Sequence, residues 1–295
     1  MIIQQIINGI ILGSIYSLVG ISFTLLIGVL HLLNFALGEV MMIGALMAWV
    51  ILTFTGLNIA LAVLIVIMAT ALLGVLMDVT AFKPLRRKKE YYLAPMISSI
   101  GFSLIFQEMA NKYTGGVPVS FPENIVQGRI FNIGNSVFSS INVTVLGIAL
   151  AMMMLLHYFL QKTKTGIAIR ATSESFRRSR LLGININHII LIVSGIASML
   201  AGLSGVLVGL TYGAISPFLG TIFVTKGFVV MLLGGFGSVH GAMLAGILLG
   251  LIEILSTSFL STTYKDLWTF VLVIIILLFR PLGLFGTLPP VHRED

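Results

Sequence analysis

Cysteine is absent from this chain of 295 residues, and charged residues are scarce. Without thiols, the chain can form no disulfide, thiolate metal site, cysteine nucleophile or Cys-ligated iron–sulfur cluster. Asp, Glu, Lys and Arg together make up 9% of the residues, against roughly 25% in ordinary soluble domains. Apolar side chains make up 58%, and the mean hydropathy is +1.10. This composition excludes a soluble globular enzyme and is typical of a membrane protein.

Motifs for nucleotide, metal or catalytic chemistry are also missing. The five histidines, at positions 31, 157, 188, 240 and 292, show no metal-ligand spacing, and no Ser-His-Asp or paired-carboxylate arrangement is present. The glycines between Gly234 and Gly241 imitate a dinucleotide fingerprint, but no strand pattern precedes them. No Lys-Ser/Thr pair follows a suitable glycine, so a P-loop is excluded. We therefore expect no cofactor, no metal and no catalytic residue.

What the chain does contain is long apolar runs. A helix needs about 20 mostly apolar residues to cross a hydrocarbon core about 30 Å thick. Eight runs approach or reach this length, and they cover residues 6–29, 39–55, 59–80, 93–111, 143–161, 187–212, 242–260 and 268–285. A ninth run, 226–235, is too short to span alone. The expected fold is an all-α polytopic membrane protein, a single domain over residues 1–295, with about eight transmembrane helices plus a short broken or re-entrant helix.

The distribution of basic residues predicts which loops face the cytoplasm. The chain carries a net charge of +7, but its Lys and Arg form short clusters between uncharged runs, so we expect no nucleic-acid partner. Five of them lie in residues 83–92 and six in 162–186. The positive-inside rule then predicts cytoplasmic loops at about 81–92 and 162–186 and an extracytoplasmic loop at about 112–142.

The two ends of the chain are assigned by alternation. Arg280 and Arg293 favour a cytoplasmic C-terminus, whereas Lys112, Arg129, Lys226 and Lys265 are counted with the outer loops. If residues 226–240 cross as a short broken span, the N-terminus lies outside and the C-terminus inside. If the segment is re-entrant, the C-terminus moves to the side that its arginines disfavour, so the broken span is preferred.

The predicted outer loop contains a possible hairpin. Residues 129–133 and 137–139 flank Gly134-Asn135, a dipeptide that favours a tight turn between two strands. This loop is either a solvated connection or a docking surface for a partner outside the cell, and the sequence does not separate the two.

Four carboxylates lie in or beside the apolar runs, where an ionisable group is costly and is a candidate for function. Asp78 and Glu108 lie near predicted helix ends, so a structural role is favoured for both. Glu39 and Glu253 lie within the apolar runs and are the stronger candidates.

Two polar or glycine-rich interruptions lie at membrane depth, one in each half of the chain: residues 31–38, followed by Glu39, and residues 234–241. Irregular backbone is tolerated there only where it faces protein or a water-filled path. The candidates for the translocation path are therefore Asn34, Gly38, Glu39, Gly234, Gly235, Gly237, Ser238 and Glu253. The alternative for the first interruption is an ordinary loop between two spans, with Glu39 as a capping residue.

Residues 163–185 are long enough for a short helix on the membrane surface, with small residues on one side and arginines on the other. By physical chemistry alone, this segment either anchors the chain to anionic lipid or docks a cytoplasmic partner. Glycines four apart elsewhere, at 9 and 13, 205 and 209, 209 and 213, and 246 and 250, indicate close helix packing and carry no information on substrate.

Over nearly its whole length, the chain resembles the LIV-type permease subunits of bacterial ABC importers for branched-chain amino acids. The resemblance rests on the order of several short motifs, which are Asn8-Gly9, Leu33-Asn34-Phe35-Ala36, Gly38-Glu39, Arg170-Ala171 with Glu174, Gly183-Ile184-Asn185, Gly234-Gly235 with Gly237-Ser238 and Gly241-Ala242, Tyr264-Lys265-Asp266, and Arg280-Pro281 with Gly283. Leu37 and His240 stand where the family leads us to expect His and Pro, and Thr172-Ser173-Glu174 is a degenerate form of the Glu-Ala-Ala loop of ABC importers.

The resemblance implies a multi-pass permease of the bacterial cytoplasmic membrane with no chemistry of its own. It also implies four kinds of contact: a homologous second permease subunit, two cytoplasmic ATPase subunits, an extracytoplasmic substrate-binding protein and the lipid bilayer. The ATPase-coupling loop would contain Gly166, Arg170, Ala171, Glu174 and Gly183. Branched-chain amino acids are the implied substrates, with other amino acids, amides or urea as related possibilities.

Two other functions remain open on the sequence. The chain could be an ion-coupled secondary transporter that uses Glu39 and Glu253 as proton or cation sites. It could also be a membrane scaffold or sensor without transport, although the two interrupted segments would then have no evident purpose.

Overall fold

The computed structural model describes residues 2–30, 33–87, 93–122, 130–133, 136–259 and 265–286. In this part of the chain, seven helical segments are long and apolar enough to cross a membrane. They contain α1 (Ile2–Leu30), α2 (Ala36–Thr55), α3 (Ile59–Met77), α5 (Leu93–Thr114), α7 (Ser140–Lys162), α10 (Ile186–Tyr212) and α12 (Val239–Phe259). Two shorter apolar helices are α11 (Leu219–Gly234) and α13 (Lys265–Phe279). The predicted all-α polytopic fold is confirmed.

Two of the predicted boundaries were wrong. The short run at 226–235 is only the second half of α11, which begins at Leu219 and has 16 residues. The last predicted span, 268–285, ends as helix α13 at Phe279. It stops there because Pro281 disfavours helical geometry at the residue before it, and Gly283 adopts φ +80°.

The remaining elements are short. A π-helical turn, η1 (Asp78–Phe82), and α4 (Lys83–Arg87) extend α3, while α8 (Lys164–Glu174) and α9 (Phe176–Leu181) follow α7. Strands β2 (Ile130–Ile133) and β3 (Ser136–Ser139) pair antiparallel with Ile130 opposite Ser139, which confirms the predicted hairpin. Its turn residues, Gly134 and Asn135, and Arg129 lie outside the described residues. Strand β1 (Val119–Ser120) pairs antiparallel with β4 (Ala214–Ile215).

Helix α1 lies at the centre of the bundle, buried along nearly its whole length, and α10 is the next most enclosed spanning helix. A helix that is apolar on every face must be surrounded by other helices or by lipid, and α1 is surrounded by α10, α11 and α12. Helix α2 then packs between α10 and α11, and α3 covers the outer side of α10. The interior is therefore built around α1 and α10.

Glycines allow α1 and α12 to approach closely. A Cβ added to Gly13 would lie 2.6 Å from the Cα of Ile247, and one added to Gly246 or Gly250 would collide with the backbone of α1. Gly205 likewise brings α10 against Met41 of α2. These contacts confirm the packing predicted from the glycine spacing. Gly213 is an exception, because it ends α10 in the left-handed conformation with φ +71°.

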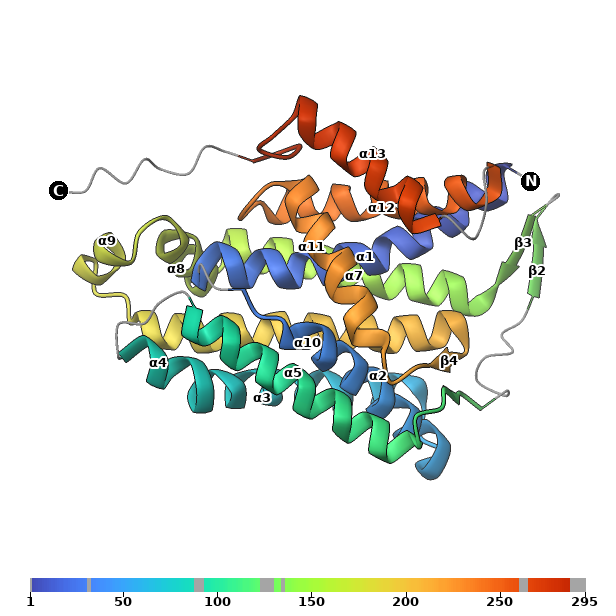
Figure 1. The fold of residues 1–295 in the computed structure, drawn as a ribbon, viewed down its shortest axis with the longest axis horizontal. Helices are drawn as coiled ribbons and strands as arrows, with labels where there is room; N and C mark the ends of the chain where they lie inside the picture. Colours follow the sequence, from blue (N-terminus) through green and yellow to red (C-terminus); the bar gives the residue numbers. More distant parts are fainter. Residues whose placement is uncertain are drawn as a thin grey trace.

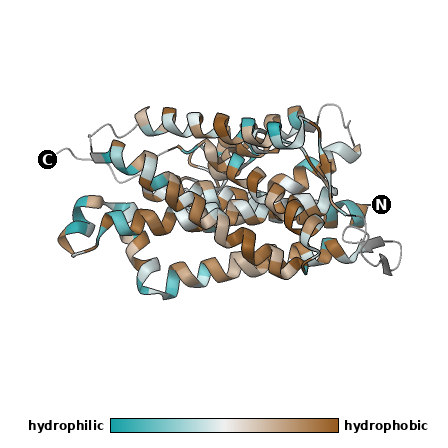
Figure 2. Cartoon of the chain, turned by 90° about the horizontal axis from the view of Figure 1, so that it is seen from below, coloured by the Kyte–Doolittle hydropathy of each residue, from teal (hydrophilic) through white to brown (hydrophobic). Residues whose placement is uncertain are grey.

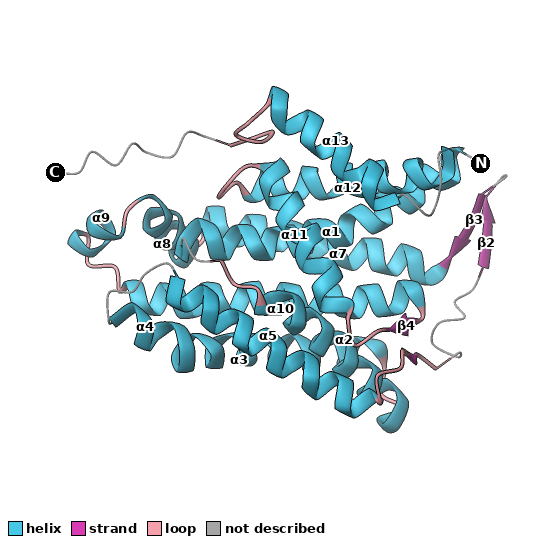
Figure 3. Ribbon diagram, in the orientation of Figure 1, coloured by secondary structure: helices cyan, strands magenta, loops and turns pink. Residues whose placement is uncertain are grey.

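The long helices run along the long axis of the molecule (Figure 1). Helices α4, α8 and α9 lie at one end, and the hairpin of β2 and β3 lies at the other, where α1 begins. Figure 3 shows that the described strands are confined to that second end. Hydrophobic residues extend along the helices, whereas hydrophilic residues gather toward the ends (Figure 2). The described parts of both predicted basic loops thus belong to the same end of the bundle.

Helix α11 runs obliquely across the other helices (Figure 1). It enters from the end that holds β4 and leads toward the end that holds α8, where the chain turns into α12. The segment therefore passes through the bundle as a short helix and does not return to the side from which it came.

Candidate functional site

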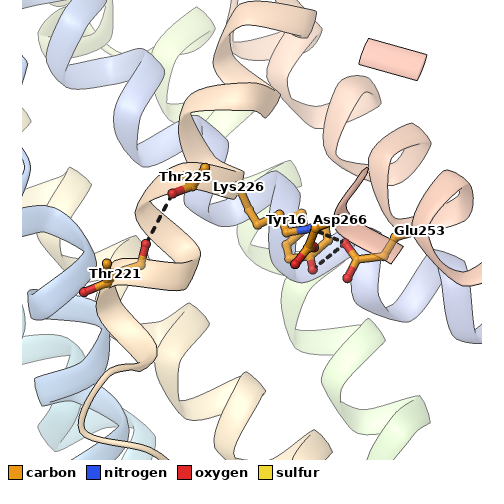
Figure 4. A network of polar contacts seen from close by, with 6 residues as sticks. All are labelled: Tyr16, Thr221, Thr225, Lys226, Glu253 and Asp266. Atoms are coloured by element: carbon orange, nitrogen blue, oxygen red, sulfur yellow. Dashed lines mark hydrogen bonds and ion pairs between the residues drawn. The ribbon is translucent and has the colours of Figure 1, made fainter. Parts of the chain in front are cut away.

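A cluster of charged residues lies inside the bundle where α11 meets α1, α12 and α13 (Figure 4). Lys226 Nζ lies 2.8 Å from Glu253 Oε2 and 2.7 Å from Asp266 Oδ1. The hydroxyl of Tyr16 donates to the same Glu253 oxygen at 2.9 Å. The rings of Tyr16 and Phe270 also face the ammonium group, with centroids 5.9 Å and 5.6 Å from Nζ.

This cluster corrects the assignment of Lys226 to an outer loop. Lys226 and Glu253 are 4% and 3% exposed, respectively, and Lys226 lies in the middle of α11. Two buried charges of opposite sign compensate each other in a medium where either alone would be strongly unfavourable. Glu253 is therefore no independent cation site: its carboxylate binds Lys226 and Tyr16.

Glu39 is buried in the first turn of α2, with 1% of its surface exposed. The Thr221 hydroxyl of α11 donates to its Oε1 over 3.4 Å, and Ser103 on α5 is a second hydroxyl that interacts with the carboxylate. Its Oε2 has no hydrogen-bond partner among the described residues. That oxygen packs against Gly220, where a Cβ would collide with the carboxylate.

Asn34 begins α2. Its Oδ1 accepts a hydrogen bond from the backbone N–H of Ala36 at 3.0 Å, while the N–H of Phe35 donates to Ser99 Oγ at 3.2 Å. These bonds satisfy backbone groups at a helix start inside the bundle. Asn34 thus has a capping contact of its own, and Gly38 allows α2 to touch Val224 and Gly220 of α11. His31 and Leu32 lie outside the described residues.

The second interruption is a tight turn between α11 and α12. Gly235 and Gly237 adopt φ +98° and +76°, and Ser238 Oγ accepts from the N–H of Gly241 at 3.1 Å, within the first turn of α12. Residues 282–286 fold against this turn, where the N–H of Leu284 donates to the carbonyl of Leu233 at 2.7 Å. The glycines at 234, 235 and 237 therefore provide a reversal of chain direction packed against protein.

Asp78 and Glu108 differ in their surroundings. Asp78 is fully buried and forms a bidentate ion pair with Arg86, with N–O distances of 2.6 Å and 2.9 Å. The structural role expected for Asp78 is thus that of a buried ion pair within the chain. Glu108 is exposed on α5.

Helices α8 and α9, with the turn through Gly183, form the segment predicted to couple to a partner. We call residues 164–183 the α8–α9 surface. Gly166 packs against Phe159 and Leu160 of α7, leaving no room for a side chain. Ala171 is half-buried, whereas Arg170 and Glu174 are exposed. Ser175 separates the helices, because its Oγ accepts from the N–H of Arg178 at 3.3 Å and starts α9.

The tip of this surface is apolar. Leu181 and Leu182 are 82% and 76% exposed, and exposed Gly183 follows them with φ +78°. Three arginines of α9, at 177, 178 and 180, are also exposed. The α8–α9 surface therefore presents two exposed leucines that directly follow three exposed arginines in the sequence.

Two histidines meet although their positions in the sequence gave no indication of it. His240 Nε2 of α12 lies 2.6 Å from His157 Nδ1 of α7, with the rings edge to face. No group of three or more potential metal ligands is found in the described ranges.

Comparisons with a family profile and with individual proteins agree on one family. The profile of the family described as "Branched-chain amino acid transport system / permease component" matches residues 5–279. The chain is 34% identical to the high-affinity branched-chain amino acid transport system permease protein BraD of Pseudomonas aeruginosa, with 96% of this chain and 95% of BraD covered. It is also 34% identical to LivH, a permease protein of the same description, from Escherichia coli, with the same coverage.

A more distant relative covers only part of the chain. The ribose import permease protein RbsC of E. coli is 27% identical over 53% of this chain and 50% of its own length. No solved structure gives a significant match.

Proposed function

Because the chain belongs to the family of branched-chain amino acid transport system permease components, we propose that its helices form one side of a path for leucine, isoleucine, valine or related amino acids. The observation that carries this conclusion is the similarity to BraD and LivH over 96% of the chain. As the permease subunit of an ABC transporter, the chain is not catalytic, and it works with ATPase and binding-protein partners. It is a multi-pass protein of a membrane, similar to permeases of the bacterial inner membrane.

We propose that residues 1–295 act as one transmembrane domain with the α8–α9 end in the cytoplasm. The support is the positive-inside rule, since the described basic residues of 83–87 and the cluster at 162–186 belong to this end. The partners would be a homologous second permease subunit, two cytoplasmic ATPase subunits and an extracytoplasmic binding protein. The hairpin of β2 and β3 would then lie on the side of the binding protein.

The α8–α9 surface is the part that we assign to the ATPase. Exposed leucines next to exposed arginines fit an interface that combines apolar and charged contacts. Gly166 holds α8 against α7, so that a push on α9 is transmitted to the bundle. ATP-driven closure of the ATPase pair would move this rigid element and reorient the helices.

The experiment is co-purification of the subunits with ATPase and uptake assays for variants of the α8–α9 surface. Leu181→Asp and Glu174→Arg should weaken ATPase association and reduce ATP-driven uptake. Gly183→Trp should do the same, because it adds bulk at a position with φ +78°. Val117→Asp is the matched control, since Val117 is 61% exposed beside β1, away from α8. Unchanged association and uptake in all three variants would exclude this coupling surface.

The alternative of an ion-coupled transporter that works alone is not supported. Family membership assigns the driving force to partner subunits, and Glu253 is bound by Lys226 and Tyr16. Of the predicted path residues, Glu39 remains the candidate for contact with substrate, because one of its oxygens has no described partner.

A further inference from the structure

We propose that Glu39 is the group that binds the α-ammonium of the amino acid during its passage. The inference rests on the proposed function and specifies which atom of this chain recognises which part of the substrate. Glu39 is 1% exposed, and no Lys, Arg or His among the described residues forms an ion pair with it. A buried carboxylate without a cation is unfavourable, so this site lacks a positive partner.

The two other buried carboxylates among the described residues show what a completed site looks like in this chain. Asp78 binds Arg86 in a bidentate pair, and Glu253 binds Lys226 at 2.8 Å. Glu39 has only the 3.4 Å bond from Thr221 on Oε1 and the Ser103 hydroxyl nearby, while Oε2 has no partner among the described residues. An ammonium group supplies three donors and a charge, which matches what is missing.

The site has a polar approach from the surface of the bundle. Thr221 and Thr225 are exposed on α11, and Gln107 Nε2 of α5 donates to Thr221 Oγ1 at 3.3 Å. Polar groups on the outer face of apolar helices are costly against lipid, so this face is suited to a water-containing path or a partner subunit. A substrate that enters along it reaches Thr221 first and Glu39 behind it.

The contact between α2 and α11 closes the site. Gly38 and Gly220 leave no room for side chains, so α11 lies directly over the carboxylate. A small displacement of α11 away from α2 uncovers Oε2. In the structure the carboxylate is occluded, and such a displacement would make it available to the ammonium group.

The first test is uptake by the complete transporter in vesicles, measured as leucine moved per ATP hydrolysed. Glu39→Gln keeps the size of the side chain and removes its charge. We expect transport per ATP to fall by about tenfold or more, because a charged hydrogen bond is lost. Glu39→Asp should retain part of the transport. Glu108→Gln is the control, since Glu108 is an exposed carboxylate on α5.

The second test reports the charge of Glu39 directly. The chain has no cysteine, so Thr221→Cys introduces a single thiol beside the carboxylate. In the intact transporter, a cationic methanethiosulfonate should label this thiol faster than an anionic one, and adding Glu39→Gln should abolish the preference. Labelling is followed on this chain by mass spectrometry. A Glu39 that carries a proton instead of a charge would give no preference.

The outcomes distinguish a failure of the proposed transport function from a failure of the role proposed for Glu39. If the unaltered complex moves no branched-chain amino acid with ATP, the proposed function fails whatever Glu39 does. If the unaltered complex transports and Glu39→Gln transports equally well per ATP, only the role of Glu39 is overturned. Loss of the cationic preference together with loss of transport supports it.

Discussion

Lys226 Nζ on α11 lies 2.8 Å from Glu253 Oε2 on α12, and both side chains are buried among apolar helices. Tyr16 on α1 donates to the same carboxylate, and Asp266 on α13 contacts the same ammonium group. One buried lysine thus connects four helices. Because α11 is short and oblique, this cluster is its main polar connection to α1, α12 and α13 among the described residues.

Removing the lysine should destabilise the chain strongly. Lys226→Met leaves Glu253 buried with an uncompensated charge, which costs about 3–5 kcal/mol in comparable buried pairs. The double variant with Glu253→Gln should recover part of the loss. Thermal unfolding of the purified protein in detergent measures both, and equal midpoints for Lys226→Met and the unaltered chain would show that the pair contributes nothing.

The Asp78 and Arg86 pair should be sensitive to geometry as well as charge. Arg86→Lys keeps the charge but cannot reproduce the two parallel N–O contacts of 2.6 Å and 2.9 Å. We expect a lower unfolding midpoint for Arg86→Lys. As a control, Arg177→Lys changes an exposed arginine of α9 and should leave the midpoint unchanged. Equal midpoints for the two variants would argue against a bidentate requirement.

The contact of α1 with α12 should not tolerate one added methyl group. Gly246→Ala places Cβ against Ser17 of α1, and overpacking of this kind costs about 1–3 kcal/mol. Gly101→Ala on α5 meets nothing within 4 Å and serves as the matched substitution. It should be neutral or slightly stabilising, since alanine favours helix. Equal unfolding midpoints for Gly246→Ala and Gly101→Ala would contradict this prediction.

Much of the fold could be predicted because a membrane span is a local property. The run predicted at 187–212 is α10, Ile186–Tyr212, and the two strands of the predicted hairpin pair as β2 and β3. In both cases, the signal lies within the segment itself. The family could also be predicted, because the chain contains its short motifs in the expected order.

The charged cluster could not be predicted for the opposite reason. Lys226 interrupts an apolar run. From the sequence alone, a lysine there is assigned to a loop, because a buried lysine needs partners of opposite charge that the sequence does not identify. Those partners lie 27 and 40 positions away on other helices. Only the packing of α11 against α12 and α13 shows that carboxylates compensate the charge of the lysine. The hydrogen bond from Tyr16 to Glu253 likewise depends on the packing of distant helices. The contact of His157 with His240 could not be predicted either, because the two residues are 83 positions apart on different helices.

The central claim is that this chain carries amino acids only as part of a complex driven by ATP. The direct measurement is leucine uptake into vesicles that contain either this chain alone or this chain with its co-purified partners, under imposed ion gradients and with ATP. The account predicts uptake only by the complex, only with ATP and its binding protein. Robust uptake by the isolated chain under a proton or sodium gradient would contradict it.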